Sequence, residues 1–358
     1  MKPTNHLEIE GRRLGLDEPT YFIADIAANH DGNLDRAVEL VHLAAAAGAH
    51  AAKFQHFAAE TIVSDAGFRS LGDQLSHQAK WKKSVFEVYR DASVALEWTP
   101  TLKRACGEAG ITFFTSAYSL DLVDAIDADV PAYKIGSGDI TWLEIIRHIA
   151  GKMKPYILAT GASTNTDVQR AVEAALAINP QLALLQCNTN YTASLDNFRF
   201  IQLNVLRTYR EMYPGMVLGL SDHTPGHATV LGAVAVGARI IEKHFTDSVT
   251  RTGPDHAFSM DPVSWREMVD RTLELEQALG NGIKRVEGNE TDTHVLQRRS
   301  IRLVGDVSRG TKLSRGSVSM LRPCPPDAVS PADVDEVVGK TTRRDMKGGD
   351  YLRWSDLG

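Results

Sequence analysis

The chain has 358 residues, 43% of them hydrophobic and 23% charged, a composition typical of a globular protein with one large and one small domain. Its formal net charge of −6 argues against nucleic acid as the main partner, because proteins that bind the phosphate backbone usually present a basic face. The sequence contains neither an apolar run of 18 residues nor the apolar core of a secretory signal. Its three dispersed cysteines indicate neither a disulfide framework nor a zinc cluster. We therefore expect a cytoplasmic protein that acts on small molecules.

Short apolar runs alternate with longer amphipathic ones from residue 21 onward, which predicts strands separated by crossover helices. The eight expected strands are residues 21–27, 51–55, 111–115, 132–135, 156–159, 182–187, 217–220 and 239–245. The expected helices are residues 34–47, 99–109, 120–127, 143–150, 167–178, 197–213, 228–236 and 262–279. Eight such units close naturally into a (β/α)8 TIM barrel. An open doubly wound sheet is the alternative, and the first strand lacks the G-x-G-x-x-G that would favour it.

Two stretches interrupt this regular pattern. Residues 58–98 are too polar and irregular for a single helix, and we expect them to form an elaborated loop at the active-site face. Residues 281–293 are rich in Gly, Asn, Asp, Glu and Thr, which predicts a linker. Beyond it, residues 294–358 contain short β-like pieces punctuated by Gly and Pro. The expected organisation is a barrel domain over residues 1–280, the linker, and a small, mainly β domain over residues 294–358.

Polar residues gather at the C-terminal ends of the expected strands. Catalytic groups of TIM barrels lie at these ends and in the loops that follow. In strand order the residues are Asp25, Asn29, His30, Lys53, Gln55, Thr115, Ser116, Lys134, Ser137, Asp139, Thr160, Asn188, Thr189, Tyr191, Ser221, Asp222, His223, Glu242 and His244. Such a distribution is typical of an active site and not of a core.

Two lysines, Lys53 and Lys134, occur within otherwise apolar strands, and Ser116, Ser137 and Ser221 lie at nearby strand ends. Two ammonium groups with several hydroxyls can supply charge-assisted hydrogen bonds to a phosphate or carboxylate. An ion-paired structural role for each lysine and a Schiff-base role for one of them are the alternatives.

Two histidines, His223 and His244, close the seventh and eighth strands, which are neighbours in a barrel. Neutral imidazoles brought together in this way can hold a divalent metal and leave coordination positions open for substrate and water. Hydrogen-bonded structural histidines are the alternative interpretation.

Several of these segments resemble the sialic acid synthase family, and the likeness runs nearly end to end. The matching segments are IADIAANHDG (23–32), AKFQ (52–55), YKIGSGD (133–139), GLSDHT (219–224), IEKHF (241–245), GPDH (253–256), RSI (299–301) and LRP (321–323). The resemblance implies a TIM barrel followed by a small antifreeze-like (SAF) domain. It also implies a domain-swapped homodimer in which the small domain covers the partner's barrel mouth.

The resemblance further implies a reaction. Family members condense phosphoenolpyruvate with an N-acetylmannosamine-type sugar and water to give a nonulosonic acid and phosphate, which makes an N-acetylneuraminate synthase the first expectation. A legionaminic or pseudaminic acid synthase using a 2,4-diacetamido-6-deoxy hexose, or a non-catalytic sugar-binding homologue, is the alternative. The implied cofactor is Mn²⁺ or Mg²⁺, held by the histidines at positions 223 and 244.

The matching positions carry implied roles. Phosphoenolpyruvate is expected to contact Lys53, Ser116, Lys134, Ser137 and Ser221, to which we add Thr189. The sugar is expected to contact Gln55, Asp139, Tyr191, Asp255 and, from the partner chain, Arg322. Asp25 is expected to act in catalysis with the two histidines, because a carboxylate at this position can stabilise positive charge at the enol carbon.

The sequence departs from the family pattern at four positions. Aspartate stands at Asp25 and Asp139 where glutamate is usual or frequent, Ala159 where serine is common, and Gln186 where histidine is common. Losing one methylene retracts a carboxylate by about 1.5 Å, and a misplacement near 1 Å can cost on the order of 100-fold in rate. The departures at positions 25 and 159 concern the expected catalytic and phosphoenolpyruvate-binding roles. The departure at position 139 concerns the identity of the sugar.

Overall fold

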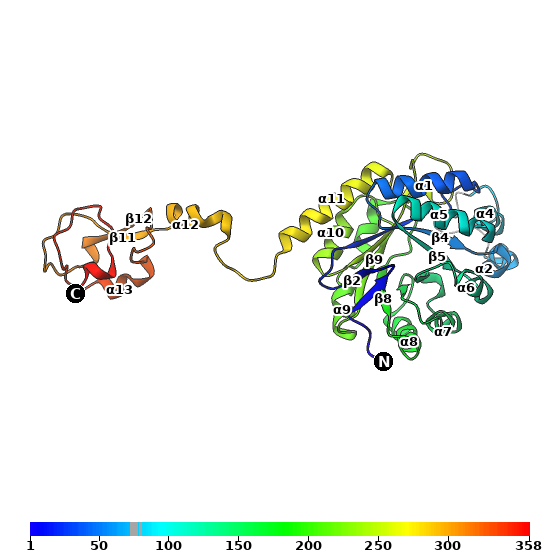
Figure 1. Cartoon of the computed structure of the whole chain (residues 1–358), viewed down its shortest axis with the longest axis horizontal. Helices are drawn as coiled ribbons and strands as arrows, with labels where there is room; N and C mark the ends of the chain where they lie inside the picture. The colour runs from blue at the N-terminus through cyan, green and yellow to red at the C-terminus, as the bar shows by residue number, and fades with distance from the viewer. Residues whose placement is uncertain (72–77, 79–80) are drawn as a thin grey trace. The chain divides into compact units, whose positions relative to one another are not determined.

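The computed structural model describes residues 1–71, 78 and 81–358, and the chain divides into two compact units, Met1–Gly280 and Asn281–Gly358. The first unit contains eight parallel strands that pair in the order β10-β3-β4-β5-β6-β7-β8-β9 and close into a barrel, with the helices outside it (Figure 1). This confirms the predicted TIM barrel and excludes the open sheet.

The elements of the barrel unit follow the predicted alternation. Its strands are β3 (Tyr21–Asp25), β4 (Ala51–His56), β5 (Thr112–Ala117), β6 (Tyr133–Ile135), β7 (Tyr156–Ala159), β8 (Leu182–Cys187), β9 (Val217–Asp222) and β10 (Ile240–His244). The main helices are α1 (Leu34–Ala46), α5 (Thr99–Ala109), α6 (Leu120–Ile126), α7 (Leu143–Gly151), α8 (Asn165–Leu176), α9 (Val205–Met212), α10 (Ala228–Ala235) and α11 (Pro262–Leu279).

Side chains of the barrel strands alternate between two hydrophobic cores. Successive residues of a strand point to opposite faces, so Phe22 and Tyr156 pack outward in the core between strands and helices. Ile23, Phe114 and Ile157 point inward and pack in a second core inside the barrel. The inward apolar residues occupy the lower part of the barrel, and the polar residues follow them toward the C-terminal ends of the strands.

A short hairpin that the sequence analysis missed precedes the barrel. β1 (His6–Ile9) and β2 (Arg12–Gly15) are antiparallel, and Leu7, Ile9 and Leu14 are each 1% exposed. These three leucine and isoleucine side chains belong to the inner core, together with the first residues of several barrel strands. The hairpin therefore closes the N-terminal end of the barrel. Its strands escaped prediction because each has four residues and carries Glu or Arg on the outer face.

In the described part of the segment from residue 58 to 98, the helices are short. They are α2 (Ala59–Ile62), α3 (Asp65–Ser70), α4 (Val85–Ala92) and the 3-10 turn η2 (Leu96–Trp98). The sixth expected helix was predicted less well, because residues 197–213 do not form one helix. The chain forms the 3-10 segment η4 (Leu195–Phe200), turns at Gln202 with a φ of 54°, and then begins α9. A residue in the left-handed backbone conformation interrupts a helix. Gln202 adopts this conformation, and no Gly or Pro at this position signals the break in the sequence.

The second unit has its own small core. β11 (Ser300–Leu303) and β12 (Val318–Leu321) pair antiparallel, and isolated bridges join further extended segments. The core residues are Ile301, Leu303, Leu313, Val318, Val329, Val337, Met346, Leu352 and Leu357. Helix α12 (Thr291–Gln297) crosses the expected boundary between linker and small domain at 293/294. None of the residues of α12 is buried, so its sequence is polar and resembles that of a linker.

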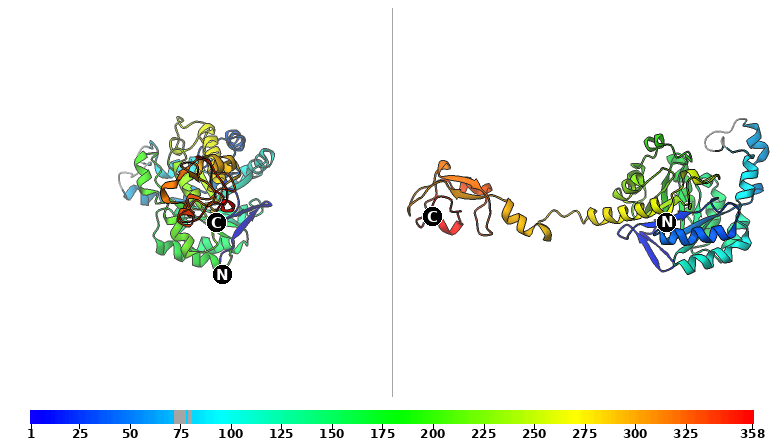
Figure 2. Two further views of the ribbon diagram at one scale, coloured as in Figure 1. Left: turned by 90° about the vertical axis from the view of Figure 1, so that its left-hand side faces the viewer. Right: turned by 90° about the horizontal axis from the view of Figure 1, so that it is seen from above.

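Figure 2 shows the barrel unit and the small second unit in two further views. In the part of the chain that the structure describes, no helix combines the length and the apolar character needed to cross a membrane.

Candidate active site

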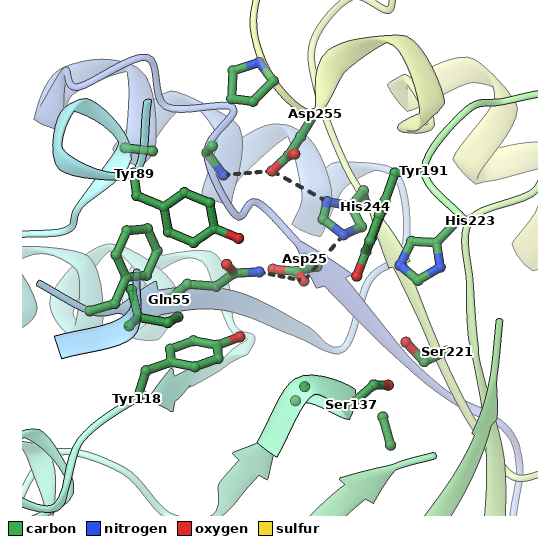
Figure 3. Close-up of a pocket in the computed structure, with 18 of the residues that line it drawn as sticks. Asp25, Gln55, Tyr89, Tyr118, Ser137, Tyr191, Ser221, His223, His244 and Asp255 are labelled. Atoms are coloured by element: carbon green, nitrogen blue, oxygen red, sulfur yellow. Dashed lines mark hydrogen bonds and ion pairs between the residues drawn. The ribbon is translucent and has the colours of Figure 1, made fainter. Parts of the chain in front are cut away.

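A cavity of about 400 Å³ opens at the C-terminal ends of the barrel strands. Its wall is built by strand ends and by the loops that follow them, as a TIM barrel predicts. The lining residues that concern the chemistry are Asp25, Lys53, Gln55, Phe57, Tyr89, Tyr118, Lys134, Ser137, Asp139, Ala159, Cys187, Tyr191, Ser221, His223, Glu242, His244 and Asp255. Figure 3 shows ten of them labelled around the cavity.

The bottom of the cavity is formed by four charged residues, Asp25, Lys53, Lys134 and Glu242, which we call the ionic floor. Their side chains are only 2–5% exposed. Lys53 Nζ lies 2.6 Å from Asp25 Oδ2 and 3.8 Å from Glu242 Oε2, and Lys134 Nζ lies 3.1 Å from Glu242 Oε1. Strand register creates this cluster, because it pairs Asp25 with Lys53 and places the inward residues of neighbouring strands side by side.

The ionic floor holds its charges despite burial. Burial alone would raise the pKa of Glu242, but Lys134 and Lys53 outweigh it and lower that pKa to about 2. Burial would lower the pKa of Lys53, whereas Asp25 and Glu242 raise it above the usual value for lysine. Burial raises the pKa of Asp25, and Lys53 opposes that shift. Lys53 is therefore placed to present an ammonium group to an anionic ligand, and Lys134 lies beside it in contact with Glu242.

The two predicted metal ligands lie together at one side of the cavity. The ring centroids of His223 and His244 are 5.4 Å apart. Burial, followed by the neighbouring His244, lowers the pKa of His223 to about 3. Burial, followed by Lys53, lowers the pKa of His244 to about 3. Both imidazoles are therefore neutral at physiological pH and available as metal ligands.

The free nitrogens of these imidazoles fit a divalent metal. His223 Nδ1 lies 2.8 Å from the backbone oxygen of Asn188 and must donate to it, which leaves Nε2 with a lone pair. The buried Nδ1 of His244 has no hydrogen-bond partner among the described residues. The described residues contain no group of three or more His, Cys, Asp or Glu side chains arranged to hold a metal. Two imidazoles alone match an open site whose other positions fall to substrate and water.

Carboxylates and an amide continue this polar side of the cavity (Figure 3). Gln55 Nε2 donates to Asp25 Oδ2 at 3.2 Å. Asp255 Oδ2 accepts from the backbone N–H of Ala28 at 3.1 Å and lies 3.8 Å from His244 Nδ1. Burial raises the pKa of Asp255 to about 7, although the Ala28 N–H counteracts the shift. Tyr191 packs edge-on against His223 with ring centroids 4.3 Å apart.

The opposite side of the cavity is apolar. Phe57 lies at the centre of an aromatic wall, with its ring 5.3 Å from that of Tyr89 and 6.0 Å from that of Tyr118. Figure 3 shows Tyr89 and Tyr118 across the cavity from His223 and His244. The wall comes from the end of β4, from α4 and from the loop after β5, so the irregular segment after the second barrel strand does contribute to this face.

Most of the predicted site residues meet in this cavity. The residues that line it are Asp25, Lys53, Gln55, Lys134, Ser137, Asp139, Tyr191, Ser221, His223, His244 and Asp255. Ser116 and Thr189 are not among the lining residues: Ser116 is 1% exposed beside Lys134 in the β5–β6 register, and Thr189 packs against Gly161. Arg322 is exposed on the second unit, so its role in the partner's site stays a prediction.

Two departures from the family pattern occupy different surroundings. Ala159 lines the cavity, where a serine would add a hydroxyl. Gln186 points out of the barrel, and its Nε2 donates to the backbone oxygen of Ile201 at 2.9 Å. The change at 159 therefore affects the cavity directly, whereas the change at 186 affects only its support.

Sequence reasoning gave no role to Glu242, Tyr89 or Tyr118. Glu242 precedes His244 by two residues on one strand, so the two-residue period of β-structure could have placed both side chains in the cavity. Its contacts with both lysines depend on strand register. The two tyrosines lie in or after irregular segments, and no pattern in the sequence predicts where they point.

Comparison with known proteins supplies the family. Residues 40–284 match the model of the NeuB family, and residues 298–358 match the model of the SAF domain. An N,N'-diacetyllegionaminic acid synthase of Legionella pneumophila is 31% identical over 96% of both chains. A pseudaminic acid synthase of Campylobacter jejuni is 29% identical over 95% of this chain and 97% of that relative. A crystal structure of an N-acetylneuraminic acid (sialic acid) synthetase from Leptospira borgpetersenii has a TM-score of 0.70 and 25% identity, and covers 82% of this chain and 96% of that chain. The chain therefore belongs to the NeuB family of nonulosonic acid synthases and carries a C-terminal SAF domain.

Proposed function

We propose that this protein condenses phosphoenolpyruvate with an N-acetylmannosamine-type sugar and water to give a nonulosonic acid and inorganic phosphate. The observation that carries the proposal is one cavity in which two buried lysines lie below a pair of neutral imidazoles with free nitrogens. The lysines suit an anionic donor, and the imidazoles suit a divalent ion beside a carbonyl acceptor.

The donor, phosphoenolpyruvate, fits the ionic floor. Lys53 and Lys134 can each give charge-assisted hydrogen bonds to its phosphate or carboxylate oxygens. Ser137 adds a hydroxyl donor, because its oxygen already accepts the backbone N–H of Gly161 at 2.9 Å and its own O–H is left to donate. The backbone at Gly161 approaches this closely only because glycine has no side chain: a Cβ there would lie 2.9 Å from Ser137 Oγ.

The reaction forms one bond between the substrates and breaks one. The methylene carbon of phosphoenolpyruvate bonds to the aldehyde carbon of the open-chain sugar, and the aldehyde oxygen takes up a proton. Water adds at the enol carbon and supplies the proton that the aldehyde oxygen takes up. The resulting tetrahedral intermediate then collapses to the ketone, which cleaves the carbon–oxygen bond to phosphate and releases phosphate with the second proton of water. Mn²⁺ or Mg²⁺ held by His223 and His244 would supply Lewis-acid polarisation of the aldehyde. Asp25, next to Lys53 and His244, would stabilise the positive charge that develops at the enol carbon.

The acceptor sugar fits between the polar side and the aromatic wall. Gln55, Asp139, Tyr191 and Asp255 offer hydrogen bonds to hydroxyl and amide groups, and Phe57 with its neighbours covers apolar groups. The wall also favours a second candidate, a 2,4-diacetamido-6-deoxy hexose, because that sugar adds an acetyl methyl and a C6 methyl. Hydrogen bonding to the acceptor would be completed by Arg322 from the partner chain of a domain-swapped homodimer.

A Schiff-base aldolase mechanism receives less support. An amine attacks a carbonyl only when it is unprotonated, so such lysines usually have a lowered pKa. Lys53 instead has a raised pKa and contacts two carboxylates. Lys134 contacts Glu242 in the same way.

The test is phosphate release from phosphoenolpyruvate in the presence of Mn²⁺, with N-acetylmannosamine, its 6-phosphate and 2,4-diacetamido-6-deoxy hexoses as acceptors. One sugar should support release, and a chelator should abolish it. His244→Ala should lower the rate by on the order of 100-fold or more. His148→Ala removes an exposed histidine on α7 that pairs with Asp124, and it should leave the rate unchanged. Absence of release with every sugar in folded, Mn²⁺-loaded protein would refute the proposal.

A further inference from the structure

A buried ion pair lies directly behind the two imidazoles. Asp222 precedes His223 at the end of β9, and Lys243 precedes His244 on β10. The two residues face each other in the strand register, and their side chains are 0% and 1% exposed. Because neighbouring residues of a strand point to opposite faces, this pair points out of the barrel while the imidazoles point in. Neither Asp222 nor Lys243 lines the cavity.

Every polar atom of the pair is used in a local network. Lys243 Nζ contacts Asp222 Oδ2 and donates to the backbone oxygen of Thr224 at 2.6 Å. Asp222 also accepts hydrogen bonds from the hydroxyl of Thr224, at 2.9 Å to Oδ2, and from the hydroxyl of Thr229, at 2.7 Å. Its Oδ1 accepts the backbone N–H of Thr224 at 3.2 Å. Lys243 therefore holds the residue before His223 and the residue after it.

The strand ladder alone does not hold His223 in place. The pairing between β9 and β10 ends at Asp222 and Lys243, so His223 lies beyond the last paired residue. His244, in contrast, remains paired with Asp25 on β3. The position of His223 relative to His244 thus depends on contacts outside this ladder. These are the hydrogen bond from His223 Nδ1 to the backbone oxygen of Asn188 and the contacts that Lys243 makes with Asp222 and Thr224 on either side of His223.

A contribution to the stability of the fold does not by itself explain the buried Asp222–Lys243 ion pair. Removing two charges from water is costly, and apolar replacements for buried ion pairs are often as stable as the pair itself. Groups behind metal ligands, in contrast, commonly fix the orientation of those ligands, and their loss weakens metal binding. We propose that Asp222 and Lys243 form a positioning pair that holds the His223 and His244 imidazoles at the separation needed to share one divalent ion. The inference rests on the metal site of the proposed function.

The matched experiment removes both charges together. In Asp222→Asn/Lys243→Met, an asparagine oxygen in the place of Oδ2 still accepts from the hydroxyls of Thr224 and Thr229, the hydrogen bond from the Thr224 N–H to Oδ1 is lost, and methionine fills the space of the lysine. The control is Asp127→Asn/Lys154→Met, which changes an ion pair of 3.0 Å at the opposite end of the barrel in the same way. Mn²⁺ binding to the full-length protein is measured from the EPR signal of free Mn²⁺, and thermal unfolding of the metal-free protein is measured in parallel.

We expect the Asp222/Lys243 double variant to bind Mn²⁺ about 10- to 100-fold more weakly than wild type, with an unfolding midpoint within a few degrees of it. The control variant should bind Mn²⁺ like wild type. Thr229→Val, which keeps both charges and removes one hydrogen bond, should weaken binding by about threefold and tests the idea even if the double variant does not fold. A variant that is folded and binds Mn²⁺ with unchanged Kd overturns the positioning role. Wild-type protein that binds no Mn²⁺ overturns the metal site itself, which separates the two failures.

Discussion

At the scale of single residues, the ionic floor explains how two lysines that line the cavity can be almost fully buried. Two ammonium and two carboxylate groups alternate within 2.6–3.8 Å, so each charge is compensated although the side chains are at most 5% exposed. The sequence shows Lys53 and Lys134 as unusual residues in apolar strands, but their partners become visible only through the strand register.

Asp139 gives the site a pH dependence that can be measured. Burial raises its pKa to about 6, and Lys134 opposes that shift. If the ionised carboxylate accepts a hydrogen bond from the sugar, kcat/KM for the acceptor should fall about tenfold for each pH unit below 6. A profile between pH 5 and 8 checks this expectation.

Asp139→Asn is the control for that profile, because it cannot ionise. The pH profile of kcat/KM for Asp139→Asn should lack the decrease below pH 6. If the decrease persists in this variant, it is caused by the titration of another group. The effect of Asp139 on stability is opposite to that of a carboxylate in an ordinary ion pair. The pKa of Asp139 in the folded state lies above its value in the unfolded state, so ionisation of this carboxyl group destabilises the fold. A shift of about two pKa units corresponds to about 3 kcal/mol, so the variant should be more stable than wild type by up to about 3 kcal/mol at pH 7.5, and this difference should disappear below about pH 4.

Much of the residue composition of the site followed from the sequence, for a definite reason. The C-terminal ends of parallel strands meet at one end of a barrel, so Lys53, Ser137 and His244 could be grouped without coordinates. Ser116 and Thr189 were grouped by the same rule but lie outside the cavity lining, because the rule gives the end of the barrel and not the direction of each side chain. Glu242 was noticed, but its role depends on contacts across strands.

At the scale of elements, the β1–β2 hairpin should contribute stability without contributing to chemistry. Leu14 is 1% exposed and packs with the first residues of the barrel strands, far from the C-terminal ends. Leu14→Ala should lower the free energy of unfolding by about 2–4 kcal/mol because it leaves a cavity. Urea unfolding measures this change, and kcat at 25 °C should stay near that of wild type.

Arg13→Ala provides the matched surface change in the same strand, since the Arg13 side chain is 57% exposed. It should alter stability by less than about 0.5 kcal/mol. Equal effects of the two substitutions would show that the hairpin does not pack against the inner core as described.

Element boundaries were predicted best where periodicity is long and the ends carry clear signals. The bounds of α11 match the expected 262–279, since Asp261 caps the helix and Pro262 begins it. The break at Gln202 and the four-residue strands β1 and β2 lack such signals. Local sequence does not determine them because contacts with the rest of the barrel decide both.

At the scale of the whole molecule, the proposed domain swap predicts complementation between two inactive variants. His244→Ala removes a proposed metal ligand from the barrel, and Arg322→Ala removes the residue proposed to reach the partner's site. Each homodimer should be inactive or nearly so. In co-expressed mixtures, a mixed dimer would have one barrel with His244 intact that receives Arg322 from its partner, so about a quarter of wild-type activity should return.

Phosphate release by the mixture, compared with each variant alone, is the measurement. A mixture as inactive as its components, although mixed dimers are recovered by differently tagged chains, would refute the contribution of Arg322 in trans. The division of the chain after Gly280 supports the design, because each unit has its own core and each substitution affects only one of them.

The hairpin that closes the N-terminal end of the barrel also determines from which side ligands enter and leave the cavity. A barrel closed at its N-terminal end opens at the C-terminal ends of its strands. Lys53 and Glu242 of the ionic floor lie one inward residue deeper than Gln55 and His244 on the same strands. Under the proposed function, a donor bound on that floor would have to arrive before the sugar that covers it. Phosphate formed there would then leave after the bulky product, so phosphate should compete with phosphoenolpyruvate for the free protein.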